Sequence, residues 1–273
     1  MSDPALAAAA LPIEFAMTPD PRLIDVFDSA GEPYRKAFST FLAHTDQKAN
    51  AMVWLEREIE ALPRRGTFID AGAGNGKLTQ ILQERFAKTI AIEPNPSLRA
   101  DLIAACPHAT ALGEIISRAE PPAPGDFVLC SHVFYYIDRS EWAATLRRLA
   151  SWLAPGGVGA IALQHHGTDC MRMLHHFTGL RFDLSSVAEG FAQESADEFD
   201  VRHDLVEAHI TTNALEPAYE IAVFMLNLIP LPSPPTRDDV RGYVARHFAQ
   251  PDGRYRFSCH QQFVRVQRRG TAH

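Results

Sequence analysis

A glycine-rich turn constrains the fold of this chain more than any other feature. The stretch Asp70-Ala-Gly72-Ala-Gly74-Asn-Gly76 follows a short apolar run and leads into the amphipathic stretch KLTQILQERFA. Glycine lets the backbone turn tightly, and it lets a ligand lie against main-chain atoms because no Cβ stands in the way. The pattern predicts a strand, a ligand-binding turn and a helix in direct succession.

Strands and helices alternate on both sides of this turn. Apolar runs typical of strands occur at 67–72, 89–94, 126–133 and 157–163. Helical patterns follow the first three of them. Asn95 is expected to cap the helix after the second run, and Ser140 to lie near the cap of a later helix. Such alternation predicts parallel βαβ units in an open, doubly wound α/β sheet.

The segments outside this alternation are expected to form a substrate lid. Residues 33–62 show a helical pattern, as do four later stretches, near 168–178, 184–194, 217–228 and 237–248. Two strand-like stretches, at 198–212 and 255–269, bracket the last two of these. Strands that bracket a helical insert predict an antiparallel hairpin at one edge of the sheet, with the insert as a lid.

One α/β domain is expected over residues 21–273, preceded by a flexible tail at residues 1–20. A chain of this length can bury one large core. Within the domain, residues 65–165 form the predicted cofactor-binding core. The predicted substrate-binding lid is built from residues 21–62 and 166–250.

Charge and cysteine content narrow the class of protein. The formal net charge of −7 argues against a protein that coats nucleic acid. Four cysteines without Cys-x-x-Cys spacing fit reduced thiols in a cytoplasmic protein. The first stretch, MSDPALAAAALPIEFAM, is interrupted by prolines and a glutamate and lacks a basic segment, so it predicts neither a signal peptide nor a membrane span. We expect a cytoplasmic protein without nucleic-acid or membrane partners.

Two acidic residues indicate which ligand the glycine turn holds. Asp70 stands two residues before Gly72, where its carboxylate would repel a pyrophosphate but attract an ammonium group. Glu93 ends the next predicted strand, where a carboxylate can accept hydrogen bonds from ribose hydroxyls. S-adenosylmethionine carries an ammonium group and a positive sulfonium and has no phosphate, so it is the expected cofactor. A nicotinamide dinucleotide shares the need for Glu93 but requires the spacing G-x-G-x-x-G.

Together with LAPGG at 153–157, these residues resemble the class I S-adenosylmethionine-dependent methyltransferases across roughly residues 65–165. The resemblance implies a Rossmann-like sheet of seven strands with the last one antiparallel. It also implies that the stretch around Glu114 and Ile116 lies beside adenine, with Ser131 opposite. Glu114 as a solvated loop acid is an equal alternative.

The stretch SHVFYYID at 131–138 ends the fourth predicted strand, where this fold presents the acceptor to the methyl group. Aromatic faces stabilise positive charge by roughly 0.5–2 kcal/mol each, which suits Tyr135 and Tyr136. His132 and Tyr136 are the candidate catalytic residues. His132 either positions the acceptor or acts as a general base, and packing alone is the remaining interpretation of these three residues.

A closer resemblance connects EPYRKAFSTFLAHTDQ, SHVFYYID and RFSCHQQFVRV with the histamine N-methyltransferase family and its bacterial relatives. It implies that Tyr34 and Phe38 line the acceptor pocket with the tyrosine pair. Three positions differ from the family. Its ammonium-binding carboxylate falls on Gln47, its fourth-strand glutamine on His132 and a late asparagine on Cys259. A shift of one residue would place Asp46 at the acidic position.

The expected function is methylation of a small molecule at the nitrogen of an amine or an imidazole-like ring, in a histamine-like, histidine-like or secondary-metabolite acceptor. The alternatives are O-methylation with His132 as the base, a catalytically silent S-adenosylmethionine-binding protein and a NAD-dependent oxidoreductase. A monomer or a homodimer is expected. The histidine-rich stretch 164–176 is interpreted as the rim of a pocket and not as a metal site, because adjacent histidines point in different directions.

Overall fold

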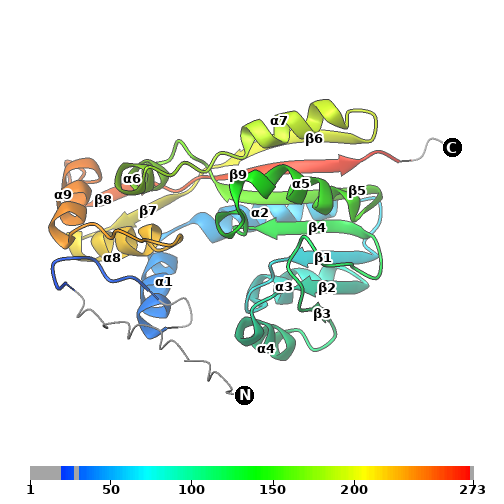
Figure 1. Ribbon diagram of the computed structural model, residues 1–273, viewed down its shortest axis with the longest axis horizontal. Coiled ribbons are helices and arrows are strands. Elements are labelled where there is room, and N and C mark those ends of the chain that lie inside the picture. Colours follow the sequence, from blue (N-terminus) through cyan, green and yellow to red (C-terminus); the bar gives the residue numbers. More distant parts are fainter. Residues whose placement is uncertain (1–19, 28–30, 271–273) are drawn as a thin grey trace, which may run out of the picture.

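A seven-stranded sheet forms the centre of the computed structural model, which describes residues 20–27 and 31–270 (Figure 1). Its strand order is β3-β2-β1-β4-β5-β9-β6. The strands are β1 (Thr67–Ala71), β2 (Lys88–Ile92), β3 (Thr110–Leu112), β4 (Gly125–Ser131), β5 (Leu153–Gln164), β6 (Phe199–Val206) and β9 (Gln261–Arg268). Strands β1 to β5 are parallel, and β9 is antiparallel to both of its neighbours. The predicted fold class is confirmed. The tail predicted at residues 1–20 lies, except for its last residue, outside the described residues.

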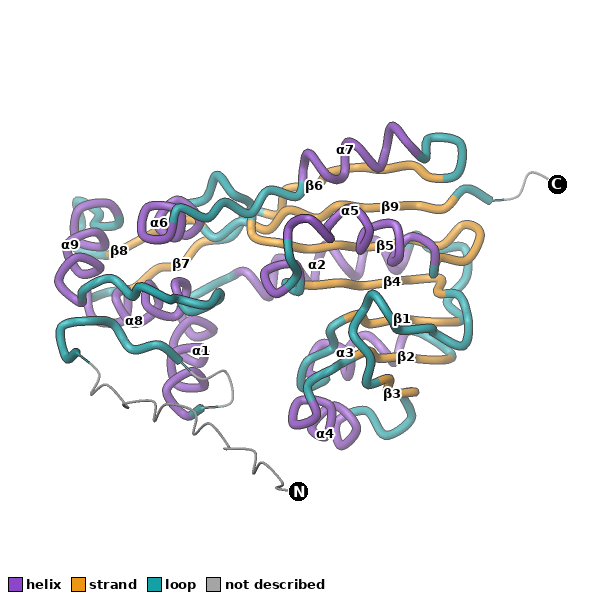
Figure 2. The backbone as a smooth tube through the Cα atoms, in the orientation of Figure 1, coloured by secondary structure: helices purple, strands orange, loops and turns teal. Residues whose placement is uncertain are grey.

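Nine α-helices accompany the sheet in the part of the chain that the structure describes (Figure 2). They are α1 (Glu32–His44), α2 (Gln47–Glu60), α3 (Lys77–Leu82), α4 (Pro96–Ala105), α5 (Trp142–Ser151), α6 (Asp169–Thr178), α7 (Ser185–Glu194), α8 (Leu215–Leu226) and α9 (Arg237–His247). Short 3₁₀ turns add η1 (Gln83–Arg85), η2 (Phe134–Tyr136) and η3 (Arg139–Glu141). None of these helices has the length and apolar composition needed to cross a membrane.

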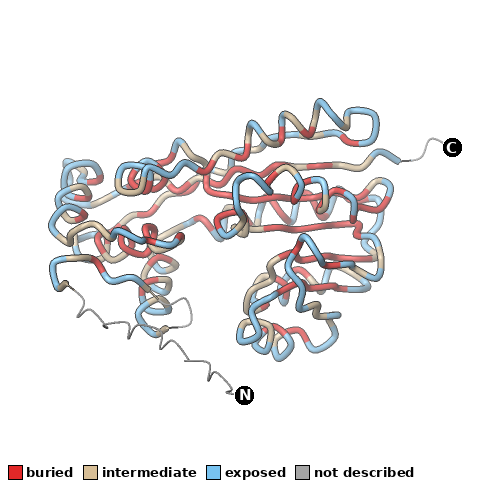
Figure 3. Tube along the Cα trace, in the orientation of Figure 1, coloured by how far each residue is buried: buried red, intermediate tan, exposed pale blue. Residues whose placement is uncertain are grey.

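Strand residues alternate between the two faces of the sheet, and each face buries a different set of helices. Phe68, Phe127 and Phe263 belong to the core packed by α2 and α3. Ile69 and Val128, their neighbours in sequence, belong to the core packed by α5 and α7. Because both faces are covered, the central strands are buried along almost their whole length (Figure 3).

A smaller assembly lies beyond the carboxyl ends of the parallel strands (Figure 1). It contains α1, α6, α8, α9 and a two-stranded sheet of β7 (His209–Thr212) and β8 (Tyr255–Ser258). The rings of Phe38 and Phe41 on α1 pack against Phe224 of α8, with centroids 5.6 and 5.5 Å apart. Residues near the N-terminus and residues of the late insert therefore build this part together, as the lid prediction requires.

One detail of the sequence prediction was wrong. Each of the two late strand-like stretches is broken into two strands, because the chain leaves the large sheet at Ala208 and at Cys259; the Cys259 N–H donates to the Ala208 carbonyl at 2.9 Å across that break. Ser140 lies near a cap, as predicted: it follows by two residues Asp138, which caps the 3₁₀ turn η3 directly before α5. The Asp138 carboxylate accepts the Ser140 N–H at 2.8 Å, because a 3₁₀ turn precedes the helix. Asn95 caps α4 as predicted.

Candidate active site

The predicted cofactor residues meet at the carboxyl edge of four neighbouring parallel strands. Asp70 lies in β1, and the glycine loop follows it; Glu93 comes directly after β2, and Ser131 ends β4. Glu114 and Ile116 follow β3. The strand order reverses between β1 and β4, and open α/β sheets bind their ligands at such a point.

Three glycines of the loop have left-handed backbones, with φ of +84° at Gly72, +56° at Gly74 and +78° at Gly76. A Cβ at Gly72 would lie 2.3 Å from a methyl carbon of Val133, so this glycine is required for packing against the segment after β4. A Cβ at Gly74 would meet no described atom within 4 Å. Gly74 therefore leaves open space where the sequence predicts that a ligand lies against the main chain.

Four N–H groups of this loop, those of Gly72, Ala73, Gly74 and Gly76, already have acceptors within the protein. Gly72 and Ala73 both donate to the carbonyl of Ile92, at 2.8 and 3.0 Å. Gly74 donates to Glu93 Oε2 at 2.9 Å, and Glu93 Oε1 accepts the Asn95 N–H at 2.8 Å. A pyrophosphate site needs free N–H groups at this position, whereas here a carboxylate occupies it. Each oxygen of Glu93 keeps a lone pair that a ribose hydroxyl can use.

Asp70 is a buried carboxylate that favours a positive ligand. Its side chain is 3% exposed, and Oδ2 accepts the hydroxyl of Thr79 at 2.7 Å. Burial raises the pKa of Asp70 to about 6, and the negative charge of Glu93 acts in the same direction. A cation placed beside Asp70 would offset this cost of burial.

The end of β3 presents apolar surface rather than a fixed acid. Ile116 is buried, and Ile115 is 49% exposed. Glu114 is exposed, as the solvated alternative expected. Ser131 is partly buried at the end of β4. An open glycine loop, an acid whose two oxygens keep free lone pairs, a buried acid and an exposed isoleucine surface fit S-adenosylmethionine.

His132 is the first of the predicted acceptor-binding residues after β4, and its backbone conformation is left-handed. Its φ of +59° makes it the one non-glycine residue with a left-handed backbone in the described part of the chain. Its Nε2 lies 2.6 Å from Nε2 of Gln261 at the start of β9. Burial lowers the pKa of His132 to about 4. The imidazole is therefore neutral at neutral pH.

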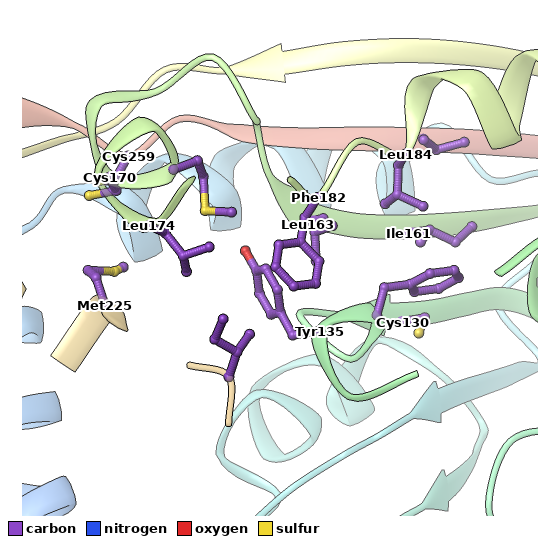
Figure 4. Packing of buried hydrophobic residues seen from close by; sticks show 14 of the residues in the cluster. Cys130, Tyr135, Ile161, Leu163, Cys170, Leu174, Phe182, Leu184, Met225 and Cys259 are labelled. Carbon is purple, nitrogen blue, oxygen red and sulfur yellow. The ribbon is translucent and has the colours of Figure 1, made fainter. Parts of the chain in front are cut away.

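The two tyrosines after His132 differ in exposure. Tyr135 is buried, its ring stacks at 6.1 Å from His132, and its hydroxyl accepts the Gln164 N–H at 3.1 Å. Figure 4 shows this hydroxyl directed toward the α6 side chains Leu174 and Cys170. Tyr136 is 67% exposed. Both belong to a 3₁₀ turn, not to the strand that the sequence suggested.

The other predicted acceptor residues form two groups. Tyr34 and Phe38 lie on α1, where burial and then the nearby Tyr136 hydroxyl raise the pKa of Tyr34 to about 12. Gln47 begins α2, is 8% exposed and donates to the carbonyl of Cys259 at 2.8 Å. The structure thus brings Tyr34 toward Tyr136, and Gln47 to Cys259.

Sequence reasoning missed two glutamines beside His132. Gln164 ends β5 and Gln261 begins β9, and their Cα atoms are direct partners in the antiparallel pair. They are 2% and 4% exposed. In the sequence, each glutamine was visible only as a polar residue at the end of an apolar strand. Gln164 and Gln261 are 97 residues apart, and only the pairing of β5 with β9 brings them together.

The histidine-rich stretch 164–176 runs from the end of β5 into α6. His166, His175 and His176 line a depression of about 850 Å³ with residues of α9, and no cluster that could hold a metal occurs among the described residues. Phe182 also lines it and packs edge-on against Tyr135, with ring centroids 5.2 Å apart. The histidine-rich stretch therefore lines the rim of this depression, as predicted. Phe182 lies between the depression and Tyr135.

Comparison with known proteins identifies the family. A family model described as a methyltransferase domain matches residues 42–212, more than half of the chain. The chain therefore belongs to this family, and the predicted class, a class I S-adenosylmethionine-dependent methyltransferase, is confirmed at that level. An uncharacterized methyltransferase of Geobacillus kaustophilus is 22% identical over 138 residues. The aligned region is 49% of this chain and spans only 63% of that relative.

Solved structures share the fold. YcgJ of Bacillus subtilis superimposes with a TM-score of 0.57 at 12% identity, covering 79% of this chain and 97% of that one. The N-methyltransferase NodS of Bradyrhizobium japonicum, in complex with S-adenosylhomocysteine, gives a TM-score of 0.53 at 10% identity, covering 87% and 99%. These identities establish a common fold. The closer resemblance to histamine N-methyltransferases stays a prediction.

Proposed function

We propose that this protein transfers the methyl group of S-adenosylmethionine to a nitrogen atom of a neutral small molecule, such as an imidazole-like ring or an uncharged amine. The choice of nitrogen rests on His132, whose pKa burial lowers, whose Nε2 lies 2.6 Å from Gln261 Nε2, and whose neighbour Val133 lies against Gly72 of the cofactor loop. The cofactor, when bound, supplies a methyl group on a positively charged sulfur.

The residues of the loop would hold the cofactor by its charge and its ribose. Asp70 would face the ammonium group, and Glu93 would accept hydrogen bonds from the ribose hydroxyls. The occupied N–H groups of Gly72 and Gly74 disfavour a nicotinamide dinucleotide at the same place. Tyr136 would offer an aromatic face to the positive charge, which shifts from sulfur to the product nitrogen.

His132 supports nitrogen as the acceptor atom because a hydroxyl acceptor would need a base. Catalysis by a general base is most effective when its pKa lies near the working pH. With a pKa of about 4, His132 is a poor proton acceptor for an alcohol or a phenol at neutral pH. A neutral nitrogen attacks with its own lone pair, so His132 has only to orient it. This favours N-methylation over the O-methylation alternative.

The surroundings of Gln47 argue against an acceptor held by its ammonium group. Gln47 points inward, whereas Asp46 is exposed and accepts the His209 N–H at 2.7 Å. The inward side chain is therefore an amide, and the carboxylate beside it is engaged on β7. Histamine itself is a poor candidate on this ground, and a neutral imidazole or a secondary metabolite fits better.

A screen of acceptors tests the proposal. The protein is incubated with S-adenosylmethionine and panels of imidazoles, amines, amino acids and phenols, and mass spectrometry detects the gain of one methylene. We expect products from nitrogen compounds. His132→Gln should keep turnover within about tenfold, because glutamine replaces the hydrogen bond but not a base. Methylation confined to phenols and abolished by His132→Gln would contradict the proposal.

A further inference from the structure

Two buried amide atoms beside His132 lack hydrogen-bond partners. Gln164 Nε2 and Gln261 Oε1 are shielded from solvent and bond to none of the residues that the structure describes. Buried polar groups are almost always paired, so such exceptions indicate a missing partner. The polar neighbour of the Gln164 amide is the thiol of Cys170. Burial raises the pKa of this thiol, and the contact with the Gln164 side chain lowers it. Sulfur is a weak acceptor and leaves the amide donor unsatisfied.

The fold aims both glutamines at the same place. Gln164 lies two residues after Ala162 on β5, and Gln261 two residues before Phe263 on β9; Ala162 and Phe263 both pack in the core with α2 and α3. Alternation along a strand therefore puts both glutamines on this face. Asp70 lies on the same face, two residues after Phe68. The unpaired atoms thus share one face and one edge of the sheet with the candidate cofactor site.

The two free atoms have opposite polarity: Gln164 Nε2 is a donor and Gln261 Oε1 is an acceptor. The groups that bond to Gln164, Gln261 and His132 among the described residues include no carboxylate. A primary ammonium offers donors only, so it would leave Gln164 Nε2 unpaired. A neutral azole or amide offers an acceptor and a donor in one plane.

From this arrangement we infer that Gln164 and Gln261 are specificity-determining residues for the methyl acceptor. Together they select a neutral planar group that presents one hydrogen-bond acceptor and one donor. The inference rests on the proposed function and adds the pair of side chains that recognises the acceptor. His132 is the partly exposed member of the trio, so an acceptor that reaches the amides also contacts His132.

Fragment binding tests this inference on protein saturated with S-adenosylhomocysteine. The probes are imidazole, which offers both features, thiazole, which only accepts, pyrrole, which only donates, and methylammonium. Saturation-transfer NMR at about pH 8.5 keeps imidazole neutral. We expect imidazole to bind at least about tenfold more tightly than the other three. Equal binding of imidazole, thiazole and pyrrole would overturn the inference.

Three variants assign the preference to particular side chains. Gln164→Met should remove the preference for imidazole over pyrrole, and Gln261→Met the preference for imidazole over thiazole. Gln262→Met is the matched control, because Gln262 is also buried on β9 but bonds to Ser185 and His203 on the other face. An unchanged preference in Gln164→Met, or its loss in Gln262→Met, would overturn the inference.

Calorimetric titration of S-adenosylhomocysteine into the wild type and each variant distinguishes a failure of the proposed function from a failure of the role inferred for the two glutamines. If the wild type fails to bind S-adenosylhomocysteine, the proposed function is wrong. If all four proteins bind it equally and the fragments show no preference, the proposed function stands and the role of the glutamines is wrong.

Discussion

Around β1 and β2 the candidate cofactor site is held by main-chain hydrogen bonds, whereas around β4, β5 and β9 the candidate acceptor site is held by side chains. The loop donors Gly72 and Gly74 bond to Ile92 and Glu93, which lie about twenty residues away. On the other side, His132 bonds to Gln261, and Gln47 to Cys259, across 129 and 212 residues. The cofactor side is thus local in sequence and the acceptor side is not.

This difference predicts that the two sides tolerate substitutions differently. A loop that is held by its own main-chain N–H groups should lose its ligand-binding geometry when a glycine or a buried charge is replaced, because no other residue can adopt the same backbone conformation or supply the same charge. An acceptor site built from side chains is expected to change its acceptor one residue at a time. The following substitutions test this contrast, in order of decreasing expected effect.

Asp70→Asn should have opposite effects on stability and cofactor binding. The folded-state pKa of Asp70, about 6, lies above its ordinary value of 3.8, so the ionised form destabilises the fold. This penalty is absent below about pH 4, grows through pH 6 and reaches roughly 3 kcal/mol above it. Asp70→Asn should raise the melting temperature at pH 7.5 but not at pH 4, in calorimetric scans.

Binding should show the matching pH dependence. In the wild type, affinity for S-adenosylhomocysteine should weaken as pH falls below about 6, because a protonated Asp70 no longer attracts the ammonium group. Asp70→Asn should bind weakly at every pH. Titrations between pH 5 and 8 decide the matter, and a wild-type affinity that does not change with pH would remove Asp70 from the cofactor site.

Gly74→Ala should weaken cofactor binding and, because alanine is strained at the φ of +56° found here, should also destabilise the fold by about 1–2 kcal/mol. The new Cβ meets no protein atom, but it fills space assigned to the cofactor, at a cost of about 1–3 kcal/mol. Calorimetry should show a dissociation constant raised tenfold or more. Gly253→Ala is the control: Gly253 also has a positive φ, +82°, and no neighbours within 4 Å, so alanine there should cost similar stability without changing affinity.

His132→Gly and His132→Ala should separate backbone strain from chemistry. Both remove the imidazole, so turnover should fall in each. Glycine adopts φ of +59° without strain, whereas alanine does not, so the glycine variant should be more stable by about 1 kcal/mol. Urea unfolding of the pair measures this difference. Equal stabilities would mean that the left-handed backbone is not maintained in solution.

Tyr136→Ala should have the smallest effect on stability, within about 0.5 kcal/mol, because the side chain is 67% exposed. Its kcat/KM for the acceptor should fall while the affinity for S-adenosylhomocysteine is unchanged. Tyr136→Phe should retain most of the activity, since the aromatic face remains. A loss of cofactor affinity in Tyr136→Ala would assign this residue to the cofactor site instead of the acceptor site.

The sequence was sufficient for the fold and the cofactor edge because their determinants are local. Asp70, the glycines and Glu93 lie within one strand–turn–helix–strand unit, and their spacing alone positions them. Gln164 and Gln261 could not be predicted, since they meet only through the antiparallel pairing of β5 and β9. The cap near Ser140 was predicted to within two residues, because Asp138 and Ser140 are both residue types that cap helices well.

The central claim is that occupied loop donors and two acids make this edge a site for a positively charged adenosine compound without phosphate. Calorimetric titration of the wild type with S-adenosylhomocysteine and with NADH tests it most directly. The account predicts one-to-one binding of S-adenosylhomocysteine and no heat from NADH. Binding of NADH at the same site, with no binding of S-adenosylhomocysteine, would contradict it.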